Sequence, residues 1–551
     1  MPSGFAQFPA PLVWLSTAAE QAFGWTSVPW DARPPTRVAI RRVRGGTTRK
    51  EATYVTEDRT PAAADNPEGA VDGDAEQPIK GRKNGLYGEV SDELAASMKS
   101  GWGDTELRGL APIAQAGYAA ERRARLSAKY PGERLVVPAG NLRTRSNDTE
   151  YSFRAASEYV HLTGDQTEDA VLVAEPVADG HEFSLYLLPR SNRENGEFWL
   201  DGNGELWVGR RHSLAEAEQL LGLPCRDVRK AGEELKAAAP APTRMVRTYD
   251  TGLEAELAEV LDEEKDTEFK EFLSELRLVK DDWEIGELRA ACTSTVNGFT
   301  DVVRELGQAV ATSERWIEGT FWRRARVEGN DIGYGSICAA GPHATTLHWV
   351  RNDGDVRPGE LLLLDAGVET NTLYTADVTR TLPINGRFNA LQRKIYDAVY
   401  DAQEAGIAAV KPGGRFRDFH DASQRVLAER LLAWGLLDAS VYDVEKVLEL
   451  GLQRRWTLHG TGHMLGLDVH DCAQARRESY VDALLEPGMV LTVEPGLYFQ
   501  QDDLTVPEEY RGIGVRIEDD ILVTADGNEN LSSALPRTAD DVEAWMASLT
   551  G

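Results

Sequence analysis

The sequence predicts a mixed α/β protein with two domains in series, and three observations lead to that class. The chain has 551 residues, which is too many for one ordinary hydrophobic core. Short β-rich runs alternate with helical stretches between about residues 130 and 250, as in α/β domains. A second set of helices and strands starts near residue 276 and carries most of the histidines and carboxylates of interest.

The composition is that of a packed globular protein and excludes several classes of partner. Apolar residues make up 42% of the chain, which contains 13 Trp. The formal net charge of −30 disfavours binding to nucleic acid or to an anionic membrane surface. Because the sequence has no run of about 18 apolar residues, we expect no membrane-spanning segment.

The four cysteines are widely spaced and form no Cys-x-x-Cys pair; they are Cys225, Cys292, Cys338 and Cys472. Neither a disulfide framework nor a thiolate zinc site is indicated. The N-terminus has no basic stretch ahead of an apolar segment, so it is a poor secretory signal. These observations favour a cytoplasmic protein.

Residues 1–80 differ in composition from the rest of the chain. Their charge changes from basic to acidic near residue 50, and Ala, Gly, Asp and Pro dominate around 62–77. Such a segment lacks the apolar pattern needed to offset chain entropy. We therefore expect 1–80 to be a largely disordered extension.

The first domain is predicted to span 90–250. A helical pattern begins near Asp92, with apolar residues at helical spacing as far as Leu110, and a second helix covers Ala116–Lys129. Four β-rich runs follow, at 134–138, 170–174, 183–188 and 205–209. Further helices are expected at 213–221 and 232–238, and a long polar helix at 253–279 links the two domains.

The second domain is predicted to span 276–545. It begins with a helix over 282–306, and the apolar run 360–365 reads as a strand that ends in Asp365. Helices are expected at 390–410 and 416–434. The intervening Pro412-Gly-Gly is a clear helix stop.

This second domain places histidines and carboxylates in a suggestive order: Asp365, Asp377, His459, His463, His470, Glu494, Arg516, Glu518. The His459/His463 spacing matches a helical zinc-protease motif. However, the expected Glu is missing, and Gly460 and Gly462 disfavour a helix there. Each residue alone is weak evidence, since an Asp at a strand end is more often a cap.

Taken together, the four carboxylates and one of the histidines give a ligand set. Such an oxygen-rich set suits a pair of Mn²⁺, Co²⁺, Fe²⁺ or Zn²⁺ ions better than a single structural zinc. Two cations ~3.5–4 Å apart need bridging carboxylates to offset their repulsion.

Five segments resemble the metal-ligand blocks of the pita-bread metallopeptidases, a family that includes methionine aminopeptidase, prolidase and aminopeptidase P. In order, they are 364–367, 376–381, 459–463, 493–498 and 515–520. The resemblance covers about 276–545 and implies a pita-bread α+β catalytic domain. It implies that two divalent ions, with Mn²⁺ expected, are bound by Asp365, Asp377, His463, Glu494 and Glu518. Asp377 and Glu518 would bridge the ions.

The upstream domain points to one branch of this family. Residues 145–151, 159–164 and 206–211 look like the creatinase-type N-terminal domain of aminopeptidase P. Methionine aminopeptidases lack that domain. The resemblance therefore implies a Xaa-Pro aminopeptidase, which removes the first residue from peptides with proline in second position.

The same resemblance assigns catalytic roles. His348, His459 and His470 match the family's active-site histidines, and His459 or His470 would stabilise the developing oxyanion. A hydroxide bridging the two metals would be the nucleophile. Glu494 would move a proton from the attacking water to the departing proline nitrogen.

Arg516 and Tyr498 are expected to orient hydrogen bonds around the metals. The alternative for Arg516 is an ordinary salt bridge to Asp519 or Asp520.

Substrate binding would also involve a neighbouring subunit, because in this family the N-terminal domain of one subunit reaches the site of another. Asp148 would meet the substrate's α-ammonium and Trp207 would line the entrance, in a homodimer or homotetramer. The simpler alternatives are a turn cap for Asp148 and a core aromatic for Trp207.

The sequence departs from the family at two points. The interval from Asp365 to Asp377 is one residue longer than usual, which the hairpin 369–374 could absorb, and the extension has no counterpart. Two other functions stay open: a prolidase, which cleaves only Xaa-Pro dipeptides, and a non-catalytic peptide-binding module on the same fold.

Overall fold

The computed structural model describes residues 90–147 and 149–550. Asp148 and the extension 1–80 therefore lie outside the described residues. No helix in the described part of the chain is long and apolar enough to cross a membrane.

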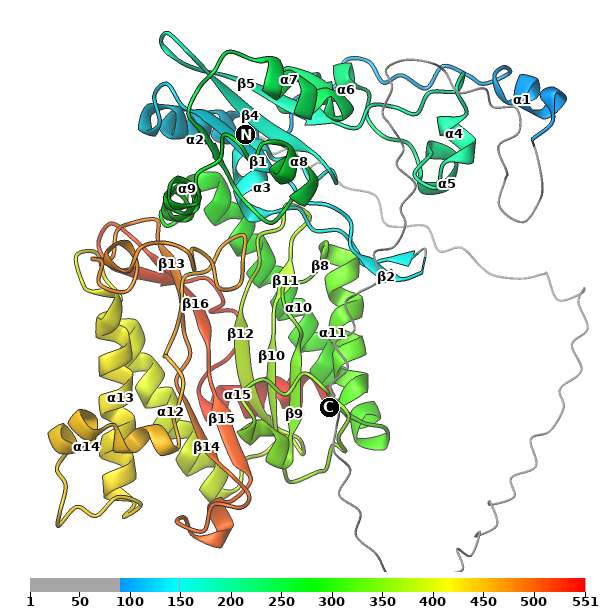
Figure 1. The fold of residues 1–551 in the computed structure, drawn as a ribbon. Helices are drawn as coiled ribbons and strands as arrows, with labels where there is room; N and C mark the ends of the chain where they lie inside the picture. The colour runs from blue at the N-terminus through cyan, green and yellow to red at the C-terminus, as the bar shows by residue number, and fades with distance from the viewer. Residues whose placement is uncertain (1–89, 148, 551) are drawn as a thin grey trace, which may run out of the picture. The chain divides into compact units, whose positions relative to one another are not determined.

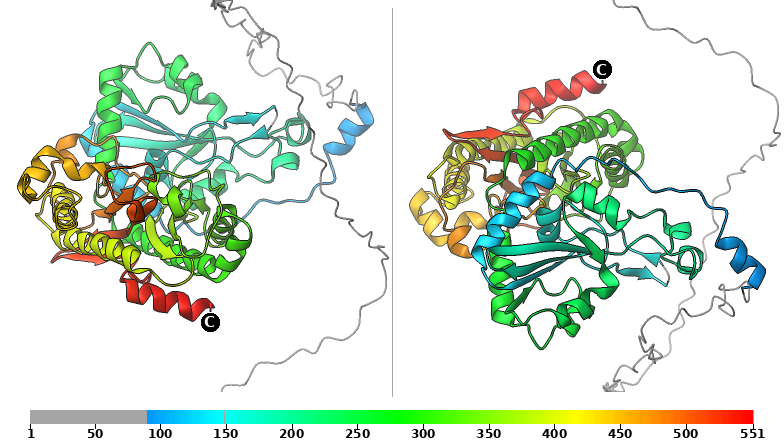
Figure 2. Two further views of the ribbon diagram at one scale, coloured as in Figure 1. Left: turned by 90° about the horizontal axis from the view of Figure 1, so that it is seen from below. Right: turned by 90° about the horizontal axis from the view of Figure 1, so that it is seen from above.

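The first domain is built on a five-stranded mixed sheet, in the order β6-β5-β4-β1-β7 (Figures 1 and 2). Its strands are β1 (Arg134–Pro138), β4 (Val171–Val177), β5 (Gly180–Leu187), β6 (Cys225–Asp227) and β7 (Thr243–Met245). Strand β1 is antiparallel to β4 and parallel to β7. Alternate side chains of β1 enter two different cores, Leu135 and Val137 on one face and Val136 on the other.

Helices cover both faces of this sheet. On the Leu135 face lie α2 (Ala116–Lys129) and α3 (Ser157–Thr163). On the Val136 face lie α7 (Ala231–Ala237) and α8 (Thr251–Glu256). The remaining helices are α1 (Asp92–Met98), α4 (Glu197–Leu200), α5 (Glu205–Val208), α6 (Leu214–Leu221) and α9 (Glu263–Leu276), and a short hairpin pairs β2 (Thr144–Ser146) with β3 (Thr149–Glu150).

In the second domain, helices enclose a set of small antiparallel sheets. One sheet has the order β12-β10-β9 and another β13-β16-β17, and two further strand pairs are β14-β15 and β11-β8. The strands are β8 (Asp331–Ile332), β9 (Ile337–Ala340), β10 (Leu361–Ala366), β11 (Val368–Glu369), β12 (Val378–Pro383), β13 (Val490–Val493), β14 (Gly496–Phe499), β15 (Ile513–Arg516), β16 (Asp519–Val523) and β17 (Asn528–Asn530). The helices are α10 (Asp282–Ala311), α11 (Glu314–Glu328), α12 (Ala390–Ala409), α13 (Phe416–Ala433), α14 (Val444–Leu450) and α15 (Ala539–Thr550).

The strands lie between the pair α10/α11 and the pair α12/α13 (Figure 1). Helix α11 packs on β9, and α12 packs on β13, β14 and β15. Apolar side chains from these helices and strands form one large core. The predicted class, an α/β domain followed by a pita-bread α+β domain, is confirmed.

Three sequence predictions about elements were wrong. Of the expected strand 205–209, residues 205–208 form the short helix α5, because an apolar run of this length has no diagnostic periodicity. The long helix expected at 253–279 is broken into α8 and α9, and Asp262 caps the second by accepting from two backbone N–H groups. The helical pattern expected to reach Leu110 ends at Met98.

All four cysteines are unpaired and buried. Cys225 lies in the first domain, and the others lie in the second: Cys292 on α10, Cys338 on β9 and Cys472 two residues beyond His470. Burial raises the pKa of each thiol, to about 12 for Cys225. The four cysteines thus form no disulfide with one another.

Candidate active site

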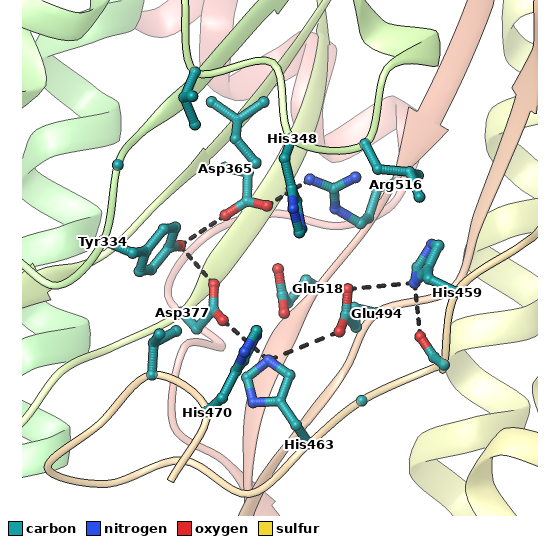
Figure 3. A pocket seen from close by; sticks show the side chains of 17 residues that line it. Tyr334, His348, Asp365, Asp377, His459, His463, His470, Glu494, Arg516 and Glu518 are labelled. Atoms are coloured by element: carbon teal, nitrogen blue, oxygen red, sulfur yellow. Dashed lines mark hydrogen bonds and ion pairs between the residues drawn. The ribbon is translucent and has the colours of Figure 1, made fainter. Parts of the chain in front are cut away.

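The predicted histidines and carboxylates of the second domain line one cavity of about 640 Å³. Figure 3 shows their side chains, including all four histidines, around this cavity, with Tyr334 on the side of Asp365 and Asp377 and with His459 on the side of Glu494. They come from separate parts of the chain, namely the segment between β9 and β10, β10 itself, the approach to β12, the loop after α14, the end of β13 and the turn between β15 and β16.

Antiparallel strand pairing explains how these carboxylates meet. Asp365 on β10 faces Thr379 on β12, so Asp377 lies just beyond the same end of the pair. Likewise, Val493 on β13 faces Asp519 on β16, which brings Glu494 and Glu518 together. The Glu518 N–H donates to Thr379 O at 3.1 Å and joins the two strand pairs.

Three of the side chains already have the spacing of a metal site. One ligand atom each from Asp377, His463 and Glu518 lies within 4.8 Å of the others. His463 Nδ1 is 3.0 Å from Met464 O, which can only accept, so Nδ1 carries the proton. The other nitrogen, Nε2, is thereby turned toward Asp377 (3.3 Å) and Glu494 (3.8 Å), as in metal-binding histidines.

The electrostatics of the cavity favour an added positive charge. Burial raises the pKa of Asp365, raises that of Glu518 well above its ordinary value, and raises that of Glu494 to about 7. Neighbouring carboxylates add to each shift, and Arg516 opposes it. Burial lowers the pKa of His463, but its hydrogen bond to Asp377 and that residue's charge outweigh this and raise it to about 9.

A single tyrosine hydroxyl shows the same excess of negative charge. Tyr334 Oη lies 2.7 Å from Asp365 Oδ1 and 2.5 Å from Asp377 Oδ1. Its one proton cannot serve both carboxylates. The oxygen-rich donors, their burial and this shortage of protons therefore fit divalent cations bound among them.

A chain of hydrogen bonds connects Arg516 to His459. Arg516 Nη2 lies 2.5 Å from Asp365 Oδ2, Nη1 donates to Tyr498 Oη at 3.0 Å, and Tyr498 O–H donates to His459 Nε2 at 2.8 Å. His459 Nδ1 donates to Gly460 O at 2.6 Å, so both ring nitrogens are occupied. Burial, with the charge of Arg516, lowers the pKa of His459 to about 4 and keeps the ring neutral.

The alternative interpretation of Arg516 was wrong. Its ion-pair partner is Asp365, whereas Asp519 pairs with Arg380 at 2.7 Å and Asp520 accepts from the Asp377 N–H. Arg516 therefore belongs to the pocket.

His348 and His470 also line the cavity, but their ring nitrogens have no hydrogen-bond partner among the described residues. The His470 ring packs edge-on against His463 with centroids 4.3 Å apart. These two histidines are thus free to bind a substrate, whereas His459 is not.

Of the two predicted substrate contacts from the first domain, only Trp207 is among the described residues, and it does not line this cavity within one chain. Asp148 lies outside the described residues. Trp207 lies on α5, is 62% exposed, and its Nε1 donates to Trp199 O at 2.8 Å, so it is not a core aromatic.

Sequence reasoning missed two residues of the site. Thr379 Oγ1 donates to Glu518 Oε2 at 2.7 Å, and its place in the block 376–381 was a usable signal. Tyr334 lies 31 residues before Asp365, outside every recognised block, and nothing in the sequence marks it.

Comparison with known proteins identifies the family. Residues 286–525 match the family model of Metallopeptidase family M24, and residues 119–245 match that of the Aminopeptidase P, N-terminal domain. The chain is 72% identical to Xaa-Pro aminopeptidase 1 of Streptomyces coelicolor over 491 residues, which cover 89% of this chain and 98% of that protein.

Solved structures agree. Escherichia coli aminopeptidase P with the inhibitor Pro-Leu superposes with a TM-score of 0.71 at 30% identity, covering 80% of this chain and 99% of that one. Pseudomonas aeruginosa aminopeptidase PepP gives a TM-score of 0.70, also at 30% identity, covering 80% of this chain and 99% of that one.

The fold, the ligand set and these matches together define a metallopeptidase. Within that class, the chain belongs to the Xaa-Pro aminopeptidases of metallopeptidase family M24. A non-catalytic peptide-binding module is thereby excluded.

Proposed function

We propose that Asp365, Asp377, His463, Glu494 and Glu518 hold two divalent ions, with Mn²⁺ the expected metal, to hydrolyse the first bond of Xaa-Pro peptides. The observation that carries this proposal is the convergence of three buried carboxylates, the half-buried Glu494 and a histidine on one cavity. When bound, the ions lower the pKa of water toward neutrality and polarise the scissile carbonyl.

The protein's own groups complete the reaction. Glu494 takes a proton from water on its carboxylate and returns it to the departing proline nitrogen. His470, whose ring nitrogens are free, donates to the carbonyl oxygen as it becomes negative. His348 contacts the proline side of the substrate. Tyr498 and Arg516 fix the position of the His459 ring, which lines the cavity.

Metal analysis combined with a peptide panel tests this function. Exhaustive chelation should abolish hydrolysis of Gly-Pro-Gly, and Mn²⁺ should restore it. His463→Ala should lose metal, whereas His348→Ala should keep metal and lose turnover. Full activity after chelation, or equal metal loss in both variants, contradicts the assignment. Cleavage of Gly-Pro but not of Gly-Pro-Gly would indicate a prolidase.

We also propose a cytoplasmic homodimer or homotetramer in which the first domain of one subunit reaches the site of another. The support is the apolar surface of α5, where Leu206, Trp207 and Val208 are each more than half exposed. In such an assembly, Trp207 would line the entrance, and Asp148 would bind the α-ammonium of the peptide. Asp148→Ala should then raise KM without emptying the metal site, and N-acetylated peptides should be poor substrates of the parent enzyme.

A further inference from the structure

The loop that carries two of the active-site histidines is held at its middle residue, Thr461. This residue lies between His459 and His463 and is only 2% exposed. It is flanked by Gly460 and Gly462, which restrict the backbone less than any other residue. The contacts of Thr461 therefore help to set the position of the loop, together with the pairing of His463 with Thr492.

Thr461 also connects this loop to a predicted metal ligand. Its carbonyl oxygen accepts from the Glu494 N–H at 2.8 Å. A displacement of Thr461 would thus be transmitted to Glu494 on one side and to His459 on the other.

A third histidine, His420 on α13, binds Thr461 from behind the cavity. Its Nδ1 lies 3.3 Å from Thr461 N and 2.9 Å from Thr461 Oγ1. Because a backbone N–H can only donate, Nδ1 is the acceptor, and the Thr461 hydroxyl donates to it as well. The ring proton then resides on Nε2. Burial lowers the pKa of His420, which is consistent with this neutral form.

The helix that carries His420 is firmly held. Phe419, Ser423 and Leu427 are buried on its inner face, and Ser423 Oγ donates to Ala402 O of α12 at 2.9 Å. His420 is thus a side chain on a fixed support, bound to a residue between two glycines.

The far side of His420 is open. It lines a cavity of about 310 Å³ that extends to His459 and Gly460, and a second of about 620 Å³ between α13 and α14. The first cavity also contains Gln453, whose Oε1 is buried without a partner among the described residues. The histidine loop therefore has open space behind it next to the His420 contact.

We propose that His420 is a positioning residue for the peptidase reaction, which fixes Thr461 and through it His459 and Glu494. It touches neither substrate nor metal. Its effect is therefore expected on kcat, because a misplacement of about 1 Å in an active site costs on the order of 100-fold in rate. The inference rests on the proposed function, and the activity of the parent enzyme in the same assay separates the two.

Two near-isosteric substitutions test the proposal. His420→Asn places an acceptor oxygen close to the position of Nδ1, whereas His420→Leu has nearly the same shape and no acceptor. We expect kcat to fall about 10- to 100-fold in the Leu variant and to stay within about threefold of the parent in the Asn variant. KM and metal content should change little in either.

The open space behind the ring allows a second measurement. In His420→Ala, added imidazole should enter from the rear cavity and raise kcat in a saturable way, while the parent enzyme and the control His212→Ala are not stimulated. His212 is a suitable control because its side chain is 54% exposed on the first domain.

Several results would overturn the proposal. They are equal kcat in the Asn and Leu variants, parallel losses of melting temperature or metal in both, and an Ala variant that imidazole does not stimulate. Such results would make His420 a residue of stability alone.

Discussion

Tyr498 joins the two sides of the pocket through one hydroxyl group. The hydroxyl accepts from Arg516 and donates to His459 Nε2. Since His459 Nδ1 is turned to Gly460 O, this histidine is held from both sides and has no proton to give to a substrate. At the residue scale, these two contacts fix the position of the His459 ring in the pocket.

Removal of the Tyr498 hydroxyl should therefore free the His459 ring to move and leave the metals bound. In Tyr498→Phe we expect kcat/KM to fall about tenfold, the value of roughly one buried hydrogen bond to a charged group. Metal content by elemental analysis should match that of the parent. Loss of metal would instead mean that Tyr498 supports Asp365 through Arg516.

The buried His161 leads to a prediction about how folding stability depends on pH. It is 2% exposed on α3, between Arg122 of α2 and Glu284 of α10, with Arg277 nearby. Burial, together with the charge of Arg122, lowers its pKa to about 4, against the effect of Glu284. In the unfolded chain the pKa is about 6.5, so between these values the unfolded chain binds the proton more tightly.

The stability that depends on a neutral His161 ring is therefore fully present above about pH 6.5 and is lost as the pH falls toward 4. Between pH 7 and pH 5, the melting temperature of the His161→Gln variant should therefore fall less than that of the parent protein. Calorimetry at both pH values measures the difference. Equal slopes for the two proteins would show that His161 does not titrate in this window.

At the scale of elements, the metal-ligand blocks were predictable because they resemble those of a known family, and Asp365, Glu494 and Glu518 lie in or just beyond strands. The apolar run 360–365 marked β10, and the pairing of β10 with β12 then fixed Asp377 beside Asp365. Tyr334 was not predictable, because it reaches the carboxylates from an irregular segment with no pattern. The same applies to His420, since a histidine on a helix has no sequence signal for what it touches.

Glu314, the first residue of α11, fixes the conformation of the loop that carries His348. Glu314 is fully buried and accepts from four donors, at 2.7–2.8 Å: Ala340 N, His343 Nδ1, Trp349 Nε1 and Gly354 N. Trp349 adjoins His348 in sequence. The carboxylate thus holds the loop on both sides of that histidine.

Glu314→Gln should destabilise the fold and displace His348, because an amide offers fewer acceptor sites and adds a donor group. We expect a loss of about 2 kcal/mol in unfolding free energy, with kcat reduced and metal retained. Glu318→Gln on the same helix is the matched control, because among the described residues Glu318 accepts from Asn352 alone, at 3.0 Å. Equal effects of the two changes would contradict this role of Glu314.

At the scale of the whole molecule, buried charges join the two domains. Arg122 of α2 pairs with Asp281, at 2.6 Å, and with Glu284, both at the start of α10. Arg154 of the first domain pairs with Glu369 at 2.7 Å. Arg277, at the start of the second domain, pairs with Glu158 of α3 at 3.7 Å and with Asp471, next to His470, at 3.0 Å. The first domain is therefore part of the support of the active site.

Truncation should distinguish the extension from this support. Deletion of 1–80 should leave activity and melting temperature nearly unchanged, since the two family matches begin at residues 119 and 286. Deletion of 1–130 also removes α2, with its buried Leu126 and Arg122, and should prevent folding. A large loss on removal of 1–80 alone would mean that the extension takes part in assembly or stability.

The four buried cysteines give this protein a set of native reporters. In the folded protein each sulfur is buried and protonated, so a thiol reagent can react only after a local opening of the structure. Cys338 lies opposite Leu364 in the strand ladder, next to Asp365, while Cys292 lies against Asp520 and Cys472 near His470. Cys225 reports on the other domain. Thiol labelling of the unmodified chain, detected by mass spectrometry with and without added metal, would thus follow local opening around the active site and in the first domain separately. Protection gained at the first three positions alone would show that the ion tightens one domain and leaves the other as it was.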